Sequence, residues 1–309
     1  MKLIFLLLSF LLSSALADDW PQWFGPEHDG VWRETGIIDK FPDGGPKVLW
    51  RTPVNRGYAG PSVAGDRVFV MDRKALDTQE AKAKGARTGE KQGDERLLCL
   101  NAVTGKVIWE KAYDCPYTMS YSAGPRVTPL VDGDRVYTFG GEGNLICRAT
   151  EDGSKKWAHD FKDLFNVKTQ TWGFAASPLV HGDLLICLAS GDGTTAVAFN
   201  KVSGKEVWRS LTAKQPGYCP PCIVKHKGRD LLLIWHPEAI NALDPLNGKI
   251  YWRVPWKVRY GLTITAPQMV DDEHLFLSSF YNGSTLLMLK EDESTPDIVY
   301  RTERASERE

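Results

Sequence analysis

Cys219 and Cys222, separated by two prolines, are the most closely spaced of the six cysteines in this sequence. A dithiol of this spacing can be redox-active when it lies at the N-terminus of a helix, which lowers the pKa of a thiol. The two prolines disfavour a helix here, and the apolar run that follows predicts a strand. We therefore expect either a local disulfide or two separate thiols, and no redox centre.

Other reactive arrangements give weaker patterns. The six histidines are scattered without an i,i+4 pair, and His236-Pro-Glu238 is a single pair on one loop. Neither arrangement provides the three or four ligands that a zinc site requires. The sequence also contains no Gly-x-Ser-x-Gly elbow and no phosphate-binding loop. We predict no catalytic residue and no metal ligand.

Aromatic, arginine and amide side chains form a third set, which recurs along the chain just before small residues and prolines. Its members are Arg56, Tyr58, Tyr121, Gln170, Trp172, Tyr218, Arg259 and Tyr260. If one face of the fold gathers them, they would make a ligand mouth for a sugar, a quinone or a peptide strand. The alternative is that they only pack where structural units begin.

The elements that would position this set are repeated. Gly105, Gly153, Gly204 and Gly248 each stand four residues before a tryptophan and are 48, 51 and 44 residues apart. A period of this length indicates a repeat architecture. Each unit reads as four short strands separated by turns, which predicts an antiparallel meander. Such sheets bury both faces by stacking around an axis, so we predict an all-β protein, a β-propeller.

The repeated glycine and tryptophan have structural explanations. A hairpin loop of three to five residues needs a residue with positive φ, which glycine adopts without steric cost. The tryptophan is the largest side chain available to fill the wedge between blades. We therefore assign a blade-docking role to five residues: Trp50, Trp109, Trp157, Trp208 and Trp252.

The motif "NAVTGKVIW" and its counterpart "ALDPLNGKIYW" resemble the PQQ-like repeat of quinoprotein dehydrogenase-type propellers. The opening "WPQWFGP" and the "YCPP" stretch resemble secreted bacterial members of that family in particular. The resemblance covers nearly all of the chain after its first residues. It extends to the propeller that scaffolds outer-membrane protein assembly, which is a lipoprotein.

The resemblance also implies where an enzyme of this family would hold its cofactor. Such enzymes use a disulfide of adjacent cysteines over PQQ, a tryptophan beneath it, Glu and Asn ligands of Ca²⁺, and an Asp base. This sequence has no adjacent cysteines, and no set of ligands matches the pattern. We therefore expect no cofactor and a non-catalytic binding or scaffold module. The alternative is a PQQ-dependent oxidoreductase similar to the alcohol dehydrogenases.

The repeat also sets the domain boundaries. Residues 46–54, "PKVLWRTPV", match only the outer strand of a unit, and five complete units follow. We divide the chain into a leader at 1–17, an aromatic and proline-rich lead-in at 18–45, and a propeller at 46–309. The resemblance implies about eight blades, so we expect an incomplete ring and a chain truncated after Glu309. The alternative is a ring of six units with one defective blade.

Composition and the first residues bear on localisation. The 309 residues carry a net charge of −1 without a basic block, which is unlike a nucleic-acid-binding protein. Lys2, an apolar run and Ala15-Leu16-Ala17 form a secretory signal pattern. The run is too short to span a membrane, and no cysteine at the cleavage point offers a lipid anchor. We expect an exported protein of the periplasm or the extracellular space, whose protein or small-molecule partner the sequence does not name.

Overall fold

The computed structural model describes residues 18–83 and 91–302, which form five separate four-stranded sheets. In each sheet the hydrogen-bonded order of the strands is their order in the chain, and all pairs are antiparallel. These sheets are the blades of the predicted propeller. The first three blades are β1 (Ser62–Ala64), β2 (Arg67–Ala75), β3 (Gly93–Asn101) and β4 (Val107–Asp114); β5 (Leu130–Asp132), β6 (Arg135–Phe139), β7 (Asn144–Ala149) and β8 (Lys155–Asp160); and β9 (Leu179–His181), β10 (Leu184–Leu188), β11 (Ala196–Asn200) and β12 (Glu206–Ser210).

Two more blades and three short helical segments complete the described chain. The blades are β13 (Cys222–His226), β14 (Arg229–His236), β15 (Ala239–Leu243) and β16 (Ile250–Pro255); and β17 (Gln268–Met269), β18 (His274–Ser279), β19 (Gly283–Met288) and β20 (Asp297–Arg301). The helical segments are α1 (Thr78–Ala83), α2 (Phe161–Phe165) and the 3₁₀ turn η1 (Arg259–Gly261). The number of blades in a complete ring stays a prediction.

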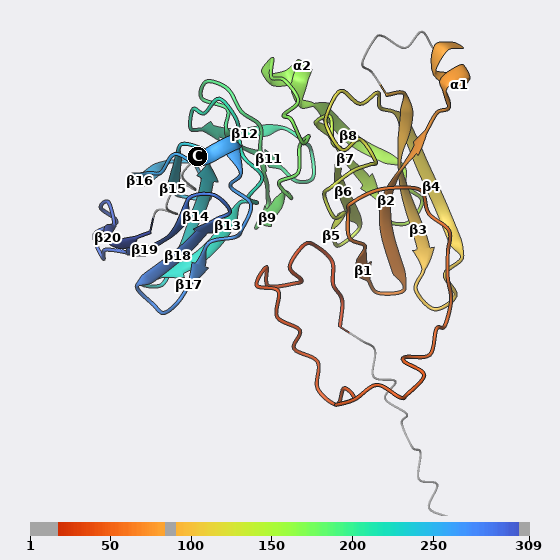
Figure 1. Ribbon diagram of the computed structural model, residues 1–309, viewed down its shortest axis with the longest axis horizontal. Coiled ribbons are helices and arrows are strands. Elements are labelled where there is room, and N and C mark those ends of the chain that lie inside the picture. The colour runs from red at the N-terminus through yellow and green to blue at the C-terminus, as the bar shows by residue number, and fades with distance from the viewer. Residues whose placement is uncertain (1–17, 84–90, 303–309) are drawn as a thin grey trace, which may run out of the picture.

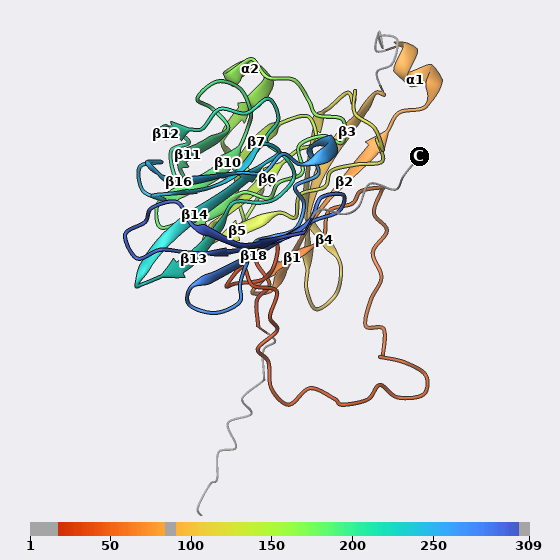
Figure 2. The same ribbon diagram turned by 60° about the vertical axis from the view of Figure 1, so that its left-hand side comes forward.

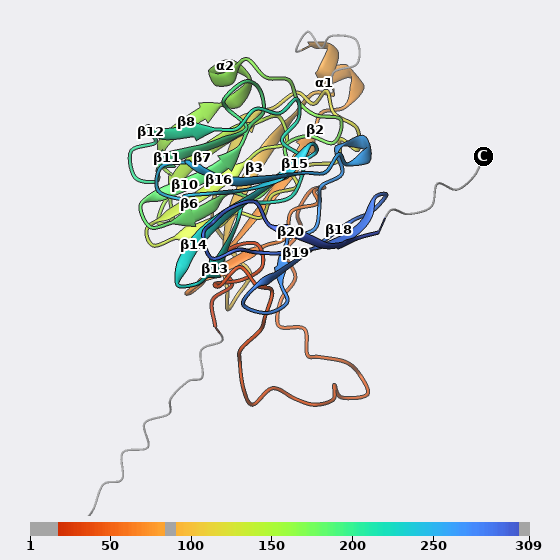
Figure 3. The same ribbon diagram turned by 90° about the vertical axis from the view of Figure 1, so that its left-hand side faces the viewer.

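Connections between strands lie alternately on two faces. We call the face with the β1–β2 and β3–β4 turns and their counterparts the turn face. The loop face carries the β2–β3, β4–β5 and β6–β7 connections and their counterparts. Figures 1, 2 and 3 show α1 and α2 at the loop-face end, while the segment before β1 extends beyond the opposite end.

Tryptophans dock neighbouring blades together through the repeated glycines. The indole nitrogens of four of the five predicted docking residues donate to a carbonyl of the following blade: Trp50 to Ala102 at 2.9 Å, Trp109 to Thr150 at 3.0 Å, Trp157 to Lys201 at 3.2 Å and Trp208 to Pro245 at 3.1 Å. Trp252 packs in a buried cluster that includes residues of the last blade. Each acceptor lies three residues before one of the repeated glycines. A Cβ built on these glycines would lie 2.4–2.8 Å from the indole, and their φ angles are 67–73°. The glycine is therefore required by the tryptophan that precedes its blade in the chain as well as by its own turn.

A β-bulge accompanies the docking residue in every blade. The register shifts between the third and fourth strands beside the docking position. The facing pairs at that position are Cys99 with Trp109, Cys147 with Trp157, Ala198 with Trp208, Ala242 with Trp252 and Leu286 with Tyr300. Small residues face the four indoles, and only the last blade has leucine with tyrosine. The bulge increases local twist and so helps to aim the indole toward the next blade.

Residues 46–54 differ from the expected outer strand. The segment belongs to no sheet, because its backbone has no ladder partner within residues 18–83 and 91–302. Trp50 nevertheless docks on the first blade, and the Thr52 hydroxyl donates to the Gly105 carbonyl at 2.5 Å. Earlier in the chain, Trp20 forms a bridge with Val63 of β1, and the Val131 amide of β5 donates to the Pro21 carbonyl. The lead-in therefore fastens the inner strands of the first two blades.

The polar composition of residues 73–96 predicts a mobile loop or a short helix, but part of this stretch is strand. β2 continues to Ala75 and β3 begins at Gly93, with Arg73 directly opposite Glu95. The short helix α1 follows β2, and residues 84–90 of the expected loop lie outside the described residues. The extended hairpin carries two charged side chains, Arg73 and Glu95, into the protein, where they are 2% and 0% exposed.

Candidate binding site

The loops that lead from each outer strand to the next inner strand are linked to one another. The Tyr58 amide donates to the Pro125 carbonyl at 2.8 Å, and the Ser120 amide donates to the Thr171 carbonyl at 2.8 Å. The Tyr218 amide donates to the Thr263 carbonyl at 2.9 Å. These bonds connect the first blade to the second, the second to the third and the fourth to the fifth. They hold the sequence-predicted aromatic set in a chain of neighbouring loops on the loop face.

The predicted site residues differ in how accessible they are. Tyr58, Tyr121 and Tyr260 are 54%, 71% and 58% exposed. Arg56 and Arg259 are exposed, and Trp172 is half-buried.

Two members of the set, Gln170 and Tyr218, are buried, so they support the face and cannot contact a partner directly. The Gln170 amide nitrogen donates to the Gly217 carbonyl at 3.3 Å, which links the third and fourth blades. Tyr218 packs edge-on against the Trp172 ring, with 5.8 Å between ring centroids. The sequence pattern predicts on which face a residue lies, but it does not predict whether its side chain is exposed or buried.

A pocket of about 580 Å³ opens on the loop face over the third and fourth blades. Four chain segments converge on it: the loop before β9, the loop before β13, the β14–β15 turn and the segment around η1. Its lining residues are Thr171, Trp172, Lys214, Gln215, Pro237, Glu238, Lys257, Val258, Tyr260 and Gly261. Trp172 and Tyr260 belong to the predicted set, and Glu238 to the His236-Pro-Glu238 pair noted in the sequence. Lys214, Gln215 and Lys257 were not predicted.

Neighbouring side chains hold the two aromatic residues of the pocket in place. Trp172 rests against buried Tyr218. The Arg259 guanidinium lies 4.8 Å from the Tyr260 ring centroid and 5.6 Å from that of Tyr281, and its Nη2 donates to the Tyr260 hydroxyl at 2.9 Å. Tyr260 adopts φ 58°, a conformation that costs energy in a residue other than glycine and recurs at functional sites. The pocket is therefore preorganised for contact with apolar or planar groups.

The charges of the pocket are predominantly positive. Lys214 and Lys257 are exposed, and their ammonium groups form no ion pair within the described parts of the chain. Glu238 accepts a hydrogen bond from the Lys214 amide at 3.2 Å. Nearby His236 is 1% exposed, and burial lowers its pKa to about 4, so it is neutral at pH 7. Two lysines without an ion pair among the described residues and one glutamate therefore line the pocket.

A buried polar network lies under the loops of the first two blades. The Glu95 carboxylate accepts hydrogen bonds from the hydroxyls of Tyr113 and Tyr117 and from the Gly141 amide, the last at 2.9 Å. The Arg73 guanidinium stacks over the Tyr117 ring at 4.2 Å. The sequence analysis missed this network, because Glu95 and Arg73 lie in a stretch whose polar composition predicts exposure.

A second acidic side chain, Glu142, fastens the next loops. It is 2% exposed and accepts from the amide and hydroxyl of Thr118, from the Thr169 hydroxyl and from the Lys162 ammonium at 3.0 Å. All of these partners belong to the protein itself, in the loops and in α2. Both carboxylates are saturated with internal donors, so we assign them a structural role.

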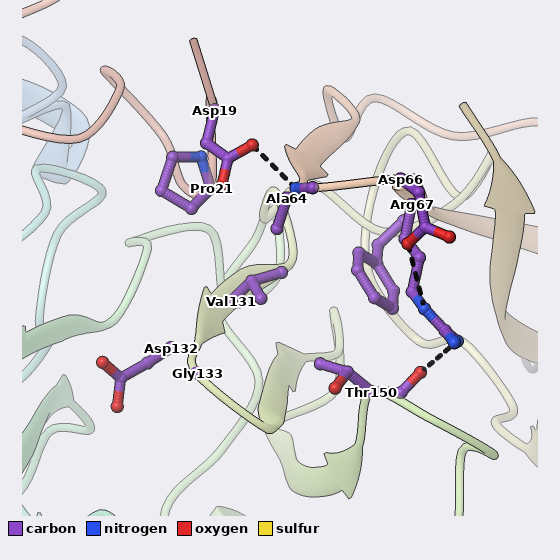
Figure 4. A pocket seen from close by; sticks show the side chains of 11 residues that line it. Asp19, Pro21, Ala64, Asp66, Arg67, Val131, Asp132, Gly133 and Thr150 are labelled. Atoms are coloured by element: carbon purple, nitrogen blue, oxygen red, sulfur yellow. Dashed lines mark hydrogen bonds and ion pairs between the residues drawn. The ribbon is translucent and has the colours of Figure 1, made fainter. Parts of the chain in front are cut away.

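The turn face has a cavity of its own, of about 470 Å³, between the first two blades (Figure 4). Arg67 reaches across it and donates to the carbonyls of Thr150 and Glu151 at 2.9 and 3.0 Å. On the other side, the Asp19 carboxylate accepts from the Gly65 amide at 2.7 Å. The polar groups here form hydrogen bonds between the two blades and between the lead-in and the first blade. We therefore assign this cavity a structural role.

The residues of the chain do not fit the PQQ and Ca²⁺ site that the family resemblance implies. The sequence has no adjacent cysteines to form the characteristic disulfide. Within residues 18–83 and 91–302, no three His, Cys, Asp or Glu side chains come together as a metal site. We therefore derive no chemistry through either group.

Cys219 and Cys222 are free thiols in the structure, which is one of the two arrangements that the sequence left open. Cys219 is buried and Cys222 is half-buried, and their sulfurs lie 3.3 and 3.2 Å from the same acceptor, the Pro220 carbonyl. Hydrogen bonding to Cys222, with burial, raises the pKa of the Cys219 thiol. The two sulfurs are thus neighbours, and their joining requires an oxidant.

We predict that oxidised glutathione joins Cys219 to Cys222 and leaves the other four cysteines as thiols. Those four are buried, whereas Cys222 is half-buried. Because the Cys219 pKa is raised, the reaction should accelerate as the pH rises. Alkylation followed by peptide mass spectrometry measures the pairing. A bridge that involves Cys115, or six remaining thiols after prolonged oxidation, would contradict the prediction.

Comparison with known proteins places the fold in a family. The family model described as outer membrane protein assembly factor BamB matches residues 36–160 and 93–283. The chain is similar to the outer membrane protein assembly factor BamB of Alkalilimnicola ehrlichii, with 26% identity over 241 residues. This match covers 77% of the chain and 52% of the relative, so the chain spans about half the length of this curated relative.

A solved structure gives the same fold. BamB from Moraxella catarrhalis matches with a TM-score of 0.50 and 14% identity, over 82% of this chain and 64% of that one. A quinohaemoprotein alcohol dehydrogenase from Pseudomonas putida HK5 matches with a TM-score of 0.46 and 15% identity, over 82% and 43%. Neither described helix, α1 or α2, has the length and the apolar run required to cross a bilayer. With five meander blades and a family match over most of its length, the chain belongs to the PQQ-like repeat propellers of the family described as outer membrane protein assembly factor BamB.

Proposed function

We propose that this protein is an exported, non-catalytic propeller that binds a partner protein through the pocket on its loop face. The observation that carries the proposal is the pocket itself, which combines an accessible indole and phenol, supported from behind, with unpaired charges. Aromatic residues with exposed rings on a rigid support are typical anchors of protein interfaces. Membership in a family named for an assembly factor supports a scaffold role.

Export is part of the same proposal. The first 17 residues have the pattern of a secretory signal, and the relatives are named for outer-membrane protein assembly. A partner of this protein would then be met outside the cytoplasm. The oxidoreductase alternative gains no support from the residues of the loop face.

We predict that Trp172→Ala and Tyr260→Ala each weaken capture of the partner by about tenfold or more without unfolding the protein. An interface anchor contributes on the order of 1–2 kcal/mol or more, which corresponds to that factor. The measurement is affinity capture from the periplasmic fraction of the source organism, with circular dichroism of each variant. Val202→Ala, at an exposed site in the β11–β12 turn on the opposite face, is the matched control.

Three outcomes would count against this proposal. Capture that is unchanged in both variants would remove the pocket from the interface. Loss of the folded spectrum would show that the two rings are core residues. An equal loss of capture in Val202→Ala would place the interface on the turn face.

A further inference from the structure

We infer that the loop-face pocket recognises an acidic segment of its partner, in which an Asp or Glu carboxylate stands beside an aromatic or aliphatic side chain. The inference rests on the proposed function and specifies the chemistry of the partner. It is drawn from two features of the same cavity, the unpaired ammonium groups and the supported rings.

The first feature is charge. Lys214 and Lys257 line the cavity from two different loops, and neither ammonium is neutralised by a described carboxylate. The Arg259 guanidinium lies at the rim, stacked on Tyr260. Glu238 is the only acidic residue among the described residues of the lining, and one of its oxygens already accepts a hydrogen bond from the Lys214 amide. A ligand carboxylate would therefore find cations without a competing internal partner.

The second feature is the apolar part of the lining. Trp172, Val258, Pro237 and Tyr260 present ring and aliphatic atoms to the cavity. Tyr218 supports Trp172, and Arg259 supports Tyr260, so little side-chain freedom is lost when a ring or aliphatic group packs between them. A small anion would use the lysines but leave this surface uncovered. A peptide that carries a carboxylate next to an apolar side chain would use both features.

The charges of the cavity do not suit a polyanionic ligand such as a nucleic acid. A nucleic-acid strand needs a continuous basic surface, and this chain has a net charge of −1. Glu238 would face such a strand inside the cavity. A single carboxylate among apolar neighbours, by contrast, matches the two cations while avoiding Glu238.

The test uses the full chain and three labelled synthetic peptides, followed by fluorescence anisotropy. The first peptide has phenylalanine flanked by aspartates, the second has asparagine in place of each aspartate, and the third has alanine in place of phenylalanine. We expect the first to bind, and the other two to bind about tenfold more weakly. Two exposed ion pairs together approach the free energy that a factor of ten represents.

Variants then assign the binding to the pocket. Lys214→Glu with Lys257→Glu should abolish binding of the acidic peptide. Lys205→Glu with Lys249→Glu makes the same change of charge at exposed turn-face positions and should leave binding intact. Equal loss in both double variants would show a general charge effect and overturn the inference. Equal binding of the aspartate and asparagine peptides would also overturn it.

Two further outcomes separate this inference from the proposed function. If the acidic peptide fails to bind while capture of the natural partner still depends on Trp172, the inference is wrong and the proposed function stands. If neither the peptide nor the partner responds to Trp172→Ala, both are wrong. Lysine-dependent binding to vesicles of anionic phospholipid, without binding of the peptide, would assign the cations to a membrane surface and overturn the inference.

Discussion

Replacing Trp208 by alanine is expected to lower the free energy of unfolding by about 3–5 kcal/mol, the range for large-to-small changes of buried aromatic residues. The Trp208 indole is 7% exposed and packs in a cluster that joins the third and fourth blades. Its Nε1 donates to the Pro245 carbonyl, which would lose this partner. Chemical denaturation followed by circular dichroism measures the change.

Two companion variants test whether the contact across blades is responsible. Val207→Ala alters the neighbouring residue, which is 51% exposed, and should change the free energy of unfolding by less than about 1 kcal/mol. Gly248→Ala should destabilise strongly, because its Cβ would lie 2.6 Å from the indole and its φ is 73°. If Trp208→Ala cost no more than Val207→Ala, tryptophan docking would not hold the blades together.

Replacing Glu95 by alanine is expected to destabilise the protein by about 3–5 kcal/mol, as when one partner of a buried charged network is removed. Glu95 is fully buried, and its carboxylate accepts from Tyr113, Tyr117 and Gly141. Its loss leaves these donors unsatisfied and the Arg73 guanidinium buried without its neighbouring carboxylate. Thermal unfolding measures the loss, and Glu151→Ala, at an exposed turn, is the control.

The pH dependence gives an independent readout of the same residue. Burial raises the pKa of Glu95 above its ordinary value of 4.5, although its hydrogen bonds and Arg73 oppose the change. The folded state therefore holds this proton more tightly than the unfolded chain does. The stability that Glu95 contributes is full below pH 4.5 and falls as the pH rises through the raised pKa. Glu95→Gln should remove this decline, and a pH profile identical to that of the native protein would contradict the raised pKa.

The fold could be predicted because the same short sequence motif recurs from blade to blade. A glycine at positive φ and a tryptophan four residues later recur with a nearly constant period. What the sequence could not show is that the two belong to different contacts. Gly204 touches Trp157 of the preceding blade, while Trp208 touches Gly248 of the next. Within one unit they stand four residues apart, and only the stacking of the blades reveals their partners.

The candidate site was predicted in part. Trp172 and Tyr260 stand at repeated positions before inner strands, and strand alternation assigns them to one face. Lys214 and Lys257 lie in the irregular stretches after outer strands, where no repeat signature marks them. Gln170 shares the predicted face but is 6% exposed, because linked loops cover it. The alternating direction of the strands predicts on which of the two faces a loop residue lies. Packing between neighbouring loops then determines whether that residue is accessible.

The most direct test of the binding role is site-specific photo-cross-linking in the living source organism. A photoreactive phenylalanine derivative replaces Tyr260 in one strain and Val202, on the turn face, in another. The account predicts a discrete cross-linked protein from position 260, none from position 202, and loss of the product when Trp172→Ala is added. A product from position 202 alone, or one from position 260 that persists with Trp172→Ala, would contradict it.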